Sequence, residues 1–173
     1  MKGLAICLIC LGLAGLSAAD VHAQPAESID FGGVVLGGSL GALVGGVGGG
    51  LAAYGICRAT TPAGPWADLA CLAGAMLFGY LPGVSLGATV GVTIAGGSQK
   101  IEGNLWLALG GAILGEALAY FVFDWALRSL GETPQAQRIR DLLIPVVLFG
   151  VIPVSAGTGA ALGYTLTGRS RTE

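Results

Sequence analysis

Long apolar runs, separated by short polar stretches, make up most of the chain after residue 30. Four runs cover Phe31–Cys57, Leu69–Gly97, Asn104–Leu127 and Leu142–Thr167. Each is longer than the ~20 residues that a helix needs to cross the hydrocarbon core of a bilayer. The runs lack the short length and period-two alternation of strands, and glycine and alanine suit strands poorly. The pattern predicts an all-α membrane bundle of four transmembrane helices.

Glycine recurs at every fourth position inside these runs. Residues four apart lie on one face of an α-helix, so each row forms a strip where a neighbouring backbone can approach closely. The rows either pack the helices of one monomer or also support a homo-oligomer. The glycines that we expect to pack helix against helix are Gly33, Gly37, Gly41, Gly45, Gly49, Gly79, Gly83, Gly87, Gly91, Gly111, Gly115, Gly159 and Gly163.

Proline residues interrupt the second and fourth runs. Pro82 lies in the second run, and Pro145 and Pro153 lie in the fourth. A proline inside a helix removes one backbone hydrogen bond and kinks or ends the helix. We therefore expect these two runs to form broken helices.

Two halves of the chain resemble each other. Gly79–Pro82 is similar to Gly150–Pro153, and residues 87–98 match residues 159–170 at six positions, among them three glycines and one threonine. The row Gly37, Gly41 and Gly45 likewise resembles Gly111, Gly115 and Ala119. Chance agreement between glycine-rich helices is the alternative explanation. If the repeat is real, residues 31–98 and 104–170 form two tandem helical hairpins, related by an axis near the membrane normal.

The first residues have the features of a secretory signal. Lys2 precedes the apolar stretch Leu4–Ala19, and Val21-His22-Ala23 fits a cleavage site with small residues. We expect a signal peptide over residues 1–23, followed by a single membrane domain over residues 24–173. An uncleaved anchor helix is the alternative.

Composition strengthens the membrane assignment and excludes several functions. Only 10% of the residues are charged, against about 25% in a typical soluble domain. The net charge of −2 includes no basic stripe, so the lipid bilayer is the expected partner and nucleic acid is not. The processed chain would hold no histidine, so we expect no enzyme activity, no metal site and no cofactor.

Glu116 is the residue that most resembles a functional site. It lies near the middle of the third run, where an ionised carboxylate is costly. Tyr120, Asp124 and Arg128 follow at four-residue steps on the same helix face. Glu116, Tyr120 and Asp124 could therefore form a proton or cation site of a small channel or transporter. Alternatively, Glu116 is a protonated residue hydrogen-bonded between helices, and Asp124 pairs with Arg128.

Cys57 and Cys71 lie at either end of the loop between the first two runs, where a disulfide could join them. A signal that is cleaved outside the cell membrane would place this loop in the cytoplasm. Disulfides are rare there. We therefore favour free thiols over a disulfide.

Three glycine-rich segments, Phe31–Tyr54, Pro82–Gly97 and Gly157–Thr167, resemble small glycine-zipper proteins of bacterial membranes, known as exported proteins of uncharacterised function. The resemblance implies a membrane location and little chemistry. From the glycine rows we expect a non-enzymatic integral membrane protein that acts through helix packing and self-assembly. We expect a multi-pass location in the inner membrane. The weak bias of positive charges between the two sides leaves an outer-membrane envelope protein as an alternative.

Overall fold

The structure is a computed structural model and describes residues 30–62, 64, 66–131, 133–166 and 168–170. The expected signal segment over residues 1–23 lies outside the described residues. Four described helices are long and apolar enough to cross a membrane, over Phe31–Thr60, Ala67–Ser98, Leu105–Ser129 and Gln135–Thr165. The prediction of an all-α fold with four spanning helices is confirmed.

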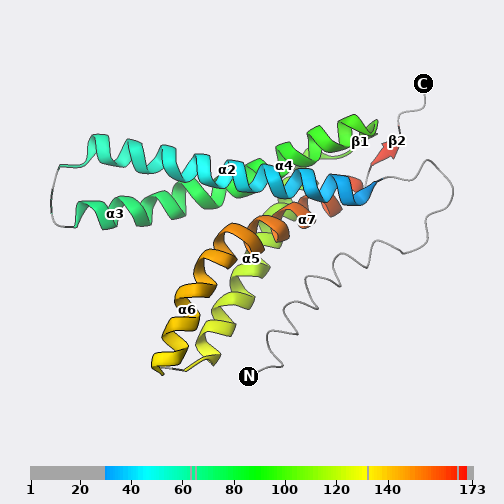
Figure 1. Cartoon of the computed structure of the whole chain (residues 1–173). Coiled ribbons are helices and arrows are strands. Elements are labelled where there is room, and N and C mark those ends of the chain that lie inside the picture. The colour runs from blue at the N-terminus through cyan, green and yellow to red at the C-terminus, as the bar shows by residue number, and fades with distance from the viewer. Residues whose placement is uncertain (1–29, 63, 65, 132, 167, 171–173) are drawn as a thin grey trace.

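The four spans form two hairpins, and each hairpin has the same order of elements (Figure 1). In each hairpin a single α-helix is followed by an arm in which a π-helix separates two α-helices. The first hairpin consists of α2 (Phe31–Thr60), α3 (Ala67–Gly74), η2 (Ala75–Tyr80) and α4 (Leu81–Ser98). The second consists of α5 (Leu105–Ser129), α6 (Pro134–Val146), η3 (Val147–Val151) and α7 (Ile152–Thr165). This shared order supports the repeat inferred from the sequence.

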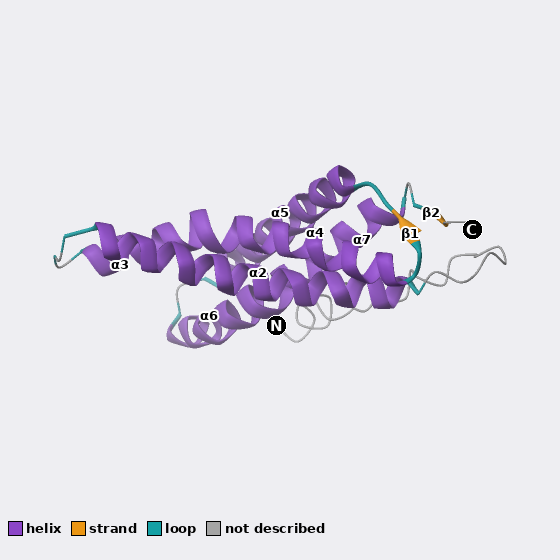
Figure 2. Cartoon of the chain, turned by 90° about the horizontal axis from the view of Figure 1, so that it is seen from above, coloured by secondary structure: helices purple, strands orange, loops and turns teal. Residues whose placement is uncertain are grey.

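The hairpins cross near one end of the molecule and diverge toward their tips (Figures 1 and 2). Two short strands lie beyond the crossing, where β1 (Ile101–Glu102) pairs antiparallel with β2 (Arg169–Ser170). Contacts between the hairpins are larger for α2 with α7 than for α4 with α5. The α4–α5 side is therefore the more open of the two hairpin interfaces.

Polar caps fix where three helices begin. The Asp30 carboxylate accepts a hydrogen bond from the Gly33 N–H, and the Asn104 side chain accepts from the N–H groups of Trp106 and Leu107. Thr133 caps α6, whose first helical residue is Pro134. A threonine cap followed by proline starts helices efficiently. The fourth span therefore begins about two turns before Leu142, where apolarity alone placed its start.

The prolines divide both arms into α–π–α units, although each arm still continues as one span. Pro82 and Pro153 lie in the first turn of α4 and α7, as expected of prolines that delimit a helix. The Leu81 N–H bonds the carbonyl of Met76, five residues back, and the Ile152 N–H bonds the carbonyl of Val147 in the same way. Each π-helix ends just before a proline, Pro82 or Pro153. The wider π-turn shifts the hydrogen bonds near each proline to five-residue spacing, so the helix continues although the proline has no N–H to donate. Pro145 lies inside α6, which also continues.

The glycine rows face each other inside the monomer. A Cβ added to Gly41 would meet the carbonyl oxygen of Gly87, and one added to Gly45 would meet that of Gly83. Gly37 and Gly49 lie in the same way against Gly91 and Gly79. These rows bring α2 and the α3–α4 arm into backbone contact, as membrane helices require.

The second hairpin uses a shorter version of the same contact. Gly111 and Gly159 oppose each other, Gly115 lies on the Ser155 carbonyl, and Gly163 lies on the Leu107 carbonyl. Gly33 differs from the other expected packing glycines, because a Cβ there would meet the side chains of Asp30 and Gln99. Its place is at the helix cap and not in the row.

Side-chain size is distributed in the reverse of a water-soluble protein. The buried core consists mainly of alanine, valine and glycine, whereas bulky residues such as Leu36, Phe78 and Trp106 are exposed. Phe78 and Trp106 are each 81% exposed. Lipid can cover such a surface and water cannot do so favourably. The chain is a multi-pass membrane protein.

The structure corrects the expectation for the two cysteines. Cys57 and Cys71 form a disulfide at the tip of the first hairpin, with their Cα atoms 5.5 Å apart. Arg58 and Asp68 form an ion pair of 3.0 Å between the same two helix ends. The free thiols favoured from the sequence are wrong, because that preference rested on the assumed orientation and not on the geometry of the hairpin.

Candidate binding site

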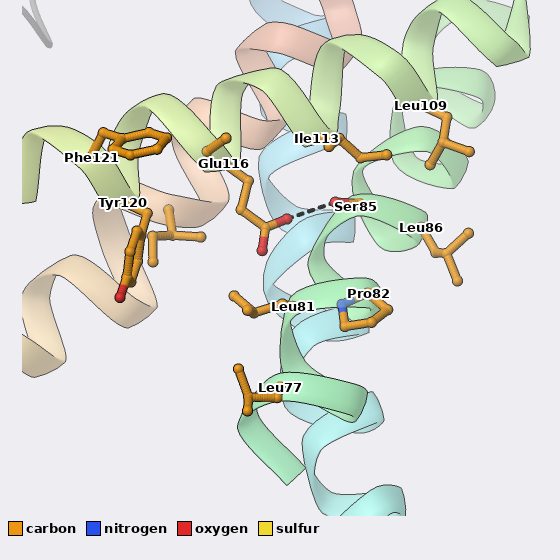
Figure 3. Close-up of a pocket in the computed structure, with 12 residues that line it drawn as sticks. Leu77, Leu81, Pro82, Ser85, Leu86, Leu109, Ile113, Glu116, Tyr120 and Phe121 are labelled. Carbon is orange, nitrogen blue, oxygen red and sulfur yellow. Dashed lines mark hydrogen bonds between the residues drawn. The ribbon is translucent and has the colours of Figure 1, made fainter. Parts of the chain in front are cut away.

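Glu116 and Ser85 link the two hairpins at membrane depth. Glu116 lies near the middle of the 25-residue α5. The Ser85 hydroxyl of α4 donates a hydrogen bond of 2.6 Å to the Glu116 carboxylate oxygen Oε2 (Figure 3). Ser85 is buried, at 5% exposure. The pair is therefore a polar centre within an otherwise apolar interface.

A crevice of about 580 Å³ lies around this pair, between the η2–α4 arm and α5. Its walls are almost entirely apolar, and Figure 3 shows their side chains around the carboxylate. The wall residues include Leu77, Leu81 and Leu86 from the first hairpin, and Leu109, Ile113 and Phe121 from α5. Several of these side chains are more than half exposed, so the crevice opens toward the surrounding lipid.

The sequence stripe that begins at Glu116 divides into two groups. Tyr120 lines the crevice together with Glu116 and is 58% exposed. Asp124 is outside the crevice lining and forms an ion pair of 2.8 Å with Arg128, one turn further along α5. Of the three residues expected to form a proton or cation site, the crevice therefore contains only Glu116 and Tyr120. Asp124 is excluded because Arg128 already compensates its charge.

Tyr80 forms a second polar link between the hairpins. It is 3% exposed, and its hydroxyl donates a hydrogen bond to the Leu148 carbonyl of η3. In the π-register, the donor to this carbonyl would be residue 153, which is a proline without an N–H. The phenol of one π-helix therefore supplies the donor that the other π-helix lacks. This bond fixes the two arms beside the crevice.

Ser85 is the site residue that the sequence reasoning missed. It lies three residues after Pro82, inside a run where serine and threonine usually bond their own backbone. The neighbouring Thr89 and Thr93 follow that pattern, each donating to the carbonyl four residues back. The repeat offered a signal, because the match of residues 87–98 with 159–170 extends back to pair the polar Ser85 with Gly157.

The described residues contain no group of three or more His, Cys, Asp or Glu side chains that could hold a metal ion. Comparisons with protein-family models, curated proteins and solved structures find no match to this chain. The resemblance to glycine-zipper proteins therefore stays a prediction. The function must be argued from the site alone.

Proposed function

We propose that this chain is a non-enzymatic membrane protein that binds and transfers protons or cations at Glu116. The observation that carries this proposal is a single carboxyl group at mid-membrane depth, bonded to Ser85 across two hairpins, in a crevice open to lipid. Ionisable residues at this depth are costly unless paired, and they commonly mark ion or proton pathways. Close glycine packing on both hairpins supports the proposal, because it provides a rigid frame around the more open α4–α5 interface.

The repeat suggests how access to the proposed site could change, because the site lies between the two repeated hairpins. Binding sites of many transporters lie near the membrane midplane, between structural repeats that rock against each other. Glu116 belongs to the second hairpin and Ser85 to the first. Relative movement of the hairpins would break or remake their hydrogen bond, and would thereby change access to the carboxyl group.

Glu116→Gln tests the proposal, because glutamine keeps the size and hydrogen-bonding capacity of the side chain and removes its exchangeable charge. Purified full-length protein is reconstituted in liposomes that contain a pH-sensitive dye, and an imposed potential drives protons inward. We expect Glu116→Gln to reduce the proton flux to the level of protein-free vesicles. Asp68→Asn, a matched change at the hairpin tip, should retain the wild-type flux. Equal flux in wild type and Glu116→Gln would contradict the proposal.

Self-assembly through helix packing is a second proposed function. The paired glycine rows are occupied within the monomer, so assembly would use small residues on the outer face of α2, namely Gly48, Ala52 and Gly55. A Cβ added to Gly48 or Gly55 would meet no described atom within 4 Å apart from its chain neighbours and the backbone of its own helix. The mass of the detergent-solubilised protein tests this. An oligomer that becomes a monomer in Gly55→Leu supports assembly, and a monomeric wild type contradicts it.

A further inference from the structure

We propose that the crevice at Glu116 binds a hydrophobic organic cation, one positive charge carried on a wide apolar body, in exchange for a proton. This inference rests on the proposed function, in which Glu116 exchanges its proton, and adds the chemical class of the ligand. It follows from the charge, shape and asymmetry of the crevice.

Charge is the first argument. Among the residues that line the crevice, Glu116 is the one whose side chain can carry a full negative charge. The lining includes no lysine or arginine. Arg128 lies on the same helix but is engaged with Asp124. An ionised Glu116 therefore lacks a cationic protein partner in its crevice. A bound cation would supply the missing positive charge, and a proton supplies it otherwise.

The walls argue for an organic ion over a metal ion. A hard metal cation needs about six oxygen ligands, whereas the polar side chains of the crevice are those of Glu116, Ser85 and Tyr120. A volume of about 580 Å³ is also far larger than a bare metal ion requires. Leucine, isoleucine and proline walls suit an apolar body. The rings of Tyr120 and Phe121 also lie on the lining, where they can face a cationic centre.

The two hairpin interfaces differ in the size and polarity of the side chains that they bring together. The α2–α7 interface is closed by small residues, with Gly38 against Gly157 and a fully buried Ala42. Extending the match of residues 87–98 with 159–170 pairs Ser85 with Gly157, and the match of Gly37–Gly45 with residues 111–119 pairs Glu116 with Ala42. Two small residues of the closed interface are thus replaced by a hydroxyl and a carboxyl in the open one. Close packing alone gives no reason for this replacement.

Two further titratable side chains, those of Tyr80 and Tyr120, must be considered for proton exchange at Glu116. The hydroxyl of Tyr80, the last residue of η2, donates a hydrogen bond to the Leu148 carbonyl and keeps its own proton. Tyr120, one turn along α5, lines the crevice. The described parts of α4 and α7 contribute hydroxyl and apolar groups and no charged side chain. Cation binding therefore releases a proton from the Glu116 carboxylic acid to solution and leaves a carboxylate beside the bound cation.

Tetraphenylphosphonium is the probe, because it has a delocalised positive charge and four aromatic rings. Its binding to full-length wild-type protein in neutral detergent is measured by equilibrium dialysis, and proton release is followed in weakly buffered solution. We expect saturable binding that strengthens as the pH rises, with about one proton released per bound cation. Glu116→Gln should weaken binding by about 30-fold or more, because it removes the buried countercharge.

Two variants separate this inference from a folding defect. Asp68→Asn removes a carboxylate far from the crevice and should bind as the wild type does. Ala117→Trp fills the crevice without changing charge, and should also prevent binding. A thermal unfolding transition in each variant that remains close to the wild type shows that the fold is intact. Binding that is equal in Glu116→Gln and wild type would overturn the inference, as would the absence of binding to wild type.

The outcomes also separate this inference from the proposed function. Proton flux that depends on Glu116, without binding of tetraphenylphosphonium, rejects the organic cation and leaves the proposed function in place. Binding that depends on Glu116, without proton flux, supports the ligand class and contradicts proton transfer across the membrane.

Discussion

At the scale of single residues, the absence of a side chain is the main structural device of this protein. Gly41 lies directly on the carbonyl oxygen of Gly87, and its neighbours along both helices repeat the contact. The atoms that block a Cβ belong to the backbone, so a rotamer change cannot relieve the overlap. Stability in this interface therefore depends on the approach of two main chains.

We predict opposite results for alanine at two glycines of α2. Gly41→Ala places a methyl group against the backbone of α4, and overpacking of this kind costs about 1–3 kcal/mol. Gly48→Ala places the same group in open space on the same helix, where alanine favours the helix by up to about 1 kcal/mol. Thermal unfolding in detergent should show a lower midpoint for Gly41→Ala and an unchanged or higher midpoint for Gly48→Ala. Equal shifts for both variants would contradict this packing.

Glu116 and Asp124 illustrate how far single residues could be interpreted from the sequence. Both were candidates for one site because they share a helix face. A stripe on one helix does not show what the opposite helix contributes. Ser85 makes the Glu116 site, and Arg128 removes Asp124 from it. The first partner is 31 residues away in the chain and the second only four, so only the second was predictable.

At the scale of elements, apolarity predicted the number and kind of spans but only some of their ends and their internal geometry. Four spanning helices follow from length and hydrophobicity, and the structure contains them. The start of α6 was missed because its first turns are polar, with Arg138 and Arg140 outside the apolar run. The Arg140 guanidinium donates to the Leu127 and Gly131 carbonyls, which fastens α6 to the end of α5.

The π-helices show why the effect of proline was hard to predict. A proline removes one N–H, and a helix can respond by kinking, by ending or by widening one turn. Which response occurs depends on whether the freed carbonyl finds another donor. For Leu148 that donor is the hydroxyl of Tyr80, which comes from the other hairpin. A contact between segments 68 residues apart is not visible in a local sequence pattern.

At the scale of the whole molecule, the disulfide predicts an orientation in the membrane. Disulfides form and persist in oxidising compartments, so the tip that carries Cys57 and Cys71 should face such a compartment. Each hairpin crosses the membrane twice, so the tip near residue 131 shares that side. Asp30 and the paired strands then face the opposite side. This is the reverse of the orientation that we expected from a cleaved signal.

Cysteine labelling in intact cells tests this orientation. We expect Cys57 and Cys71 to react with a membrane-impermeant maleimide only after treatment with a membrane-impermeant reductant. The control is Ser98→Cys at the opposite end, in a chain whose four native cysteines are serine, and it should stay unlabelled until the cells are opened. Labelling of Ser98→Cys in intact cells, with no labelling of the native pair after reduction, would restore the original orientation.

The inverted distribution of side-chain size has a consequence for how this protein can change over time. Bulky residues face outward, where one lipid-facing side chain can be exchanged for another of similar polarity at little cost. The interior has no such freedom, because at Gly87 or Gly159 even a methyl group would strike a carbonyl oxygen. Mutational tolerance should therefore be concentrated on the outside. In a saturation mutagenesis library, substitutions at the inward glycines should be depleted first, whereas substitutions at the outward leucines should be retained.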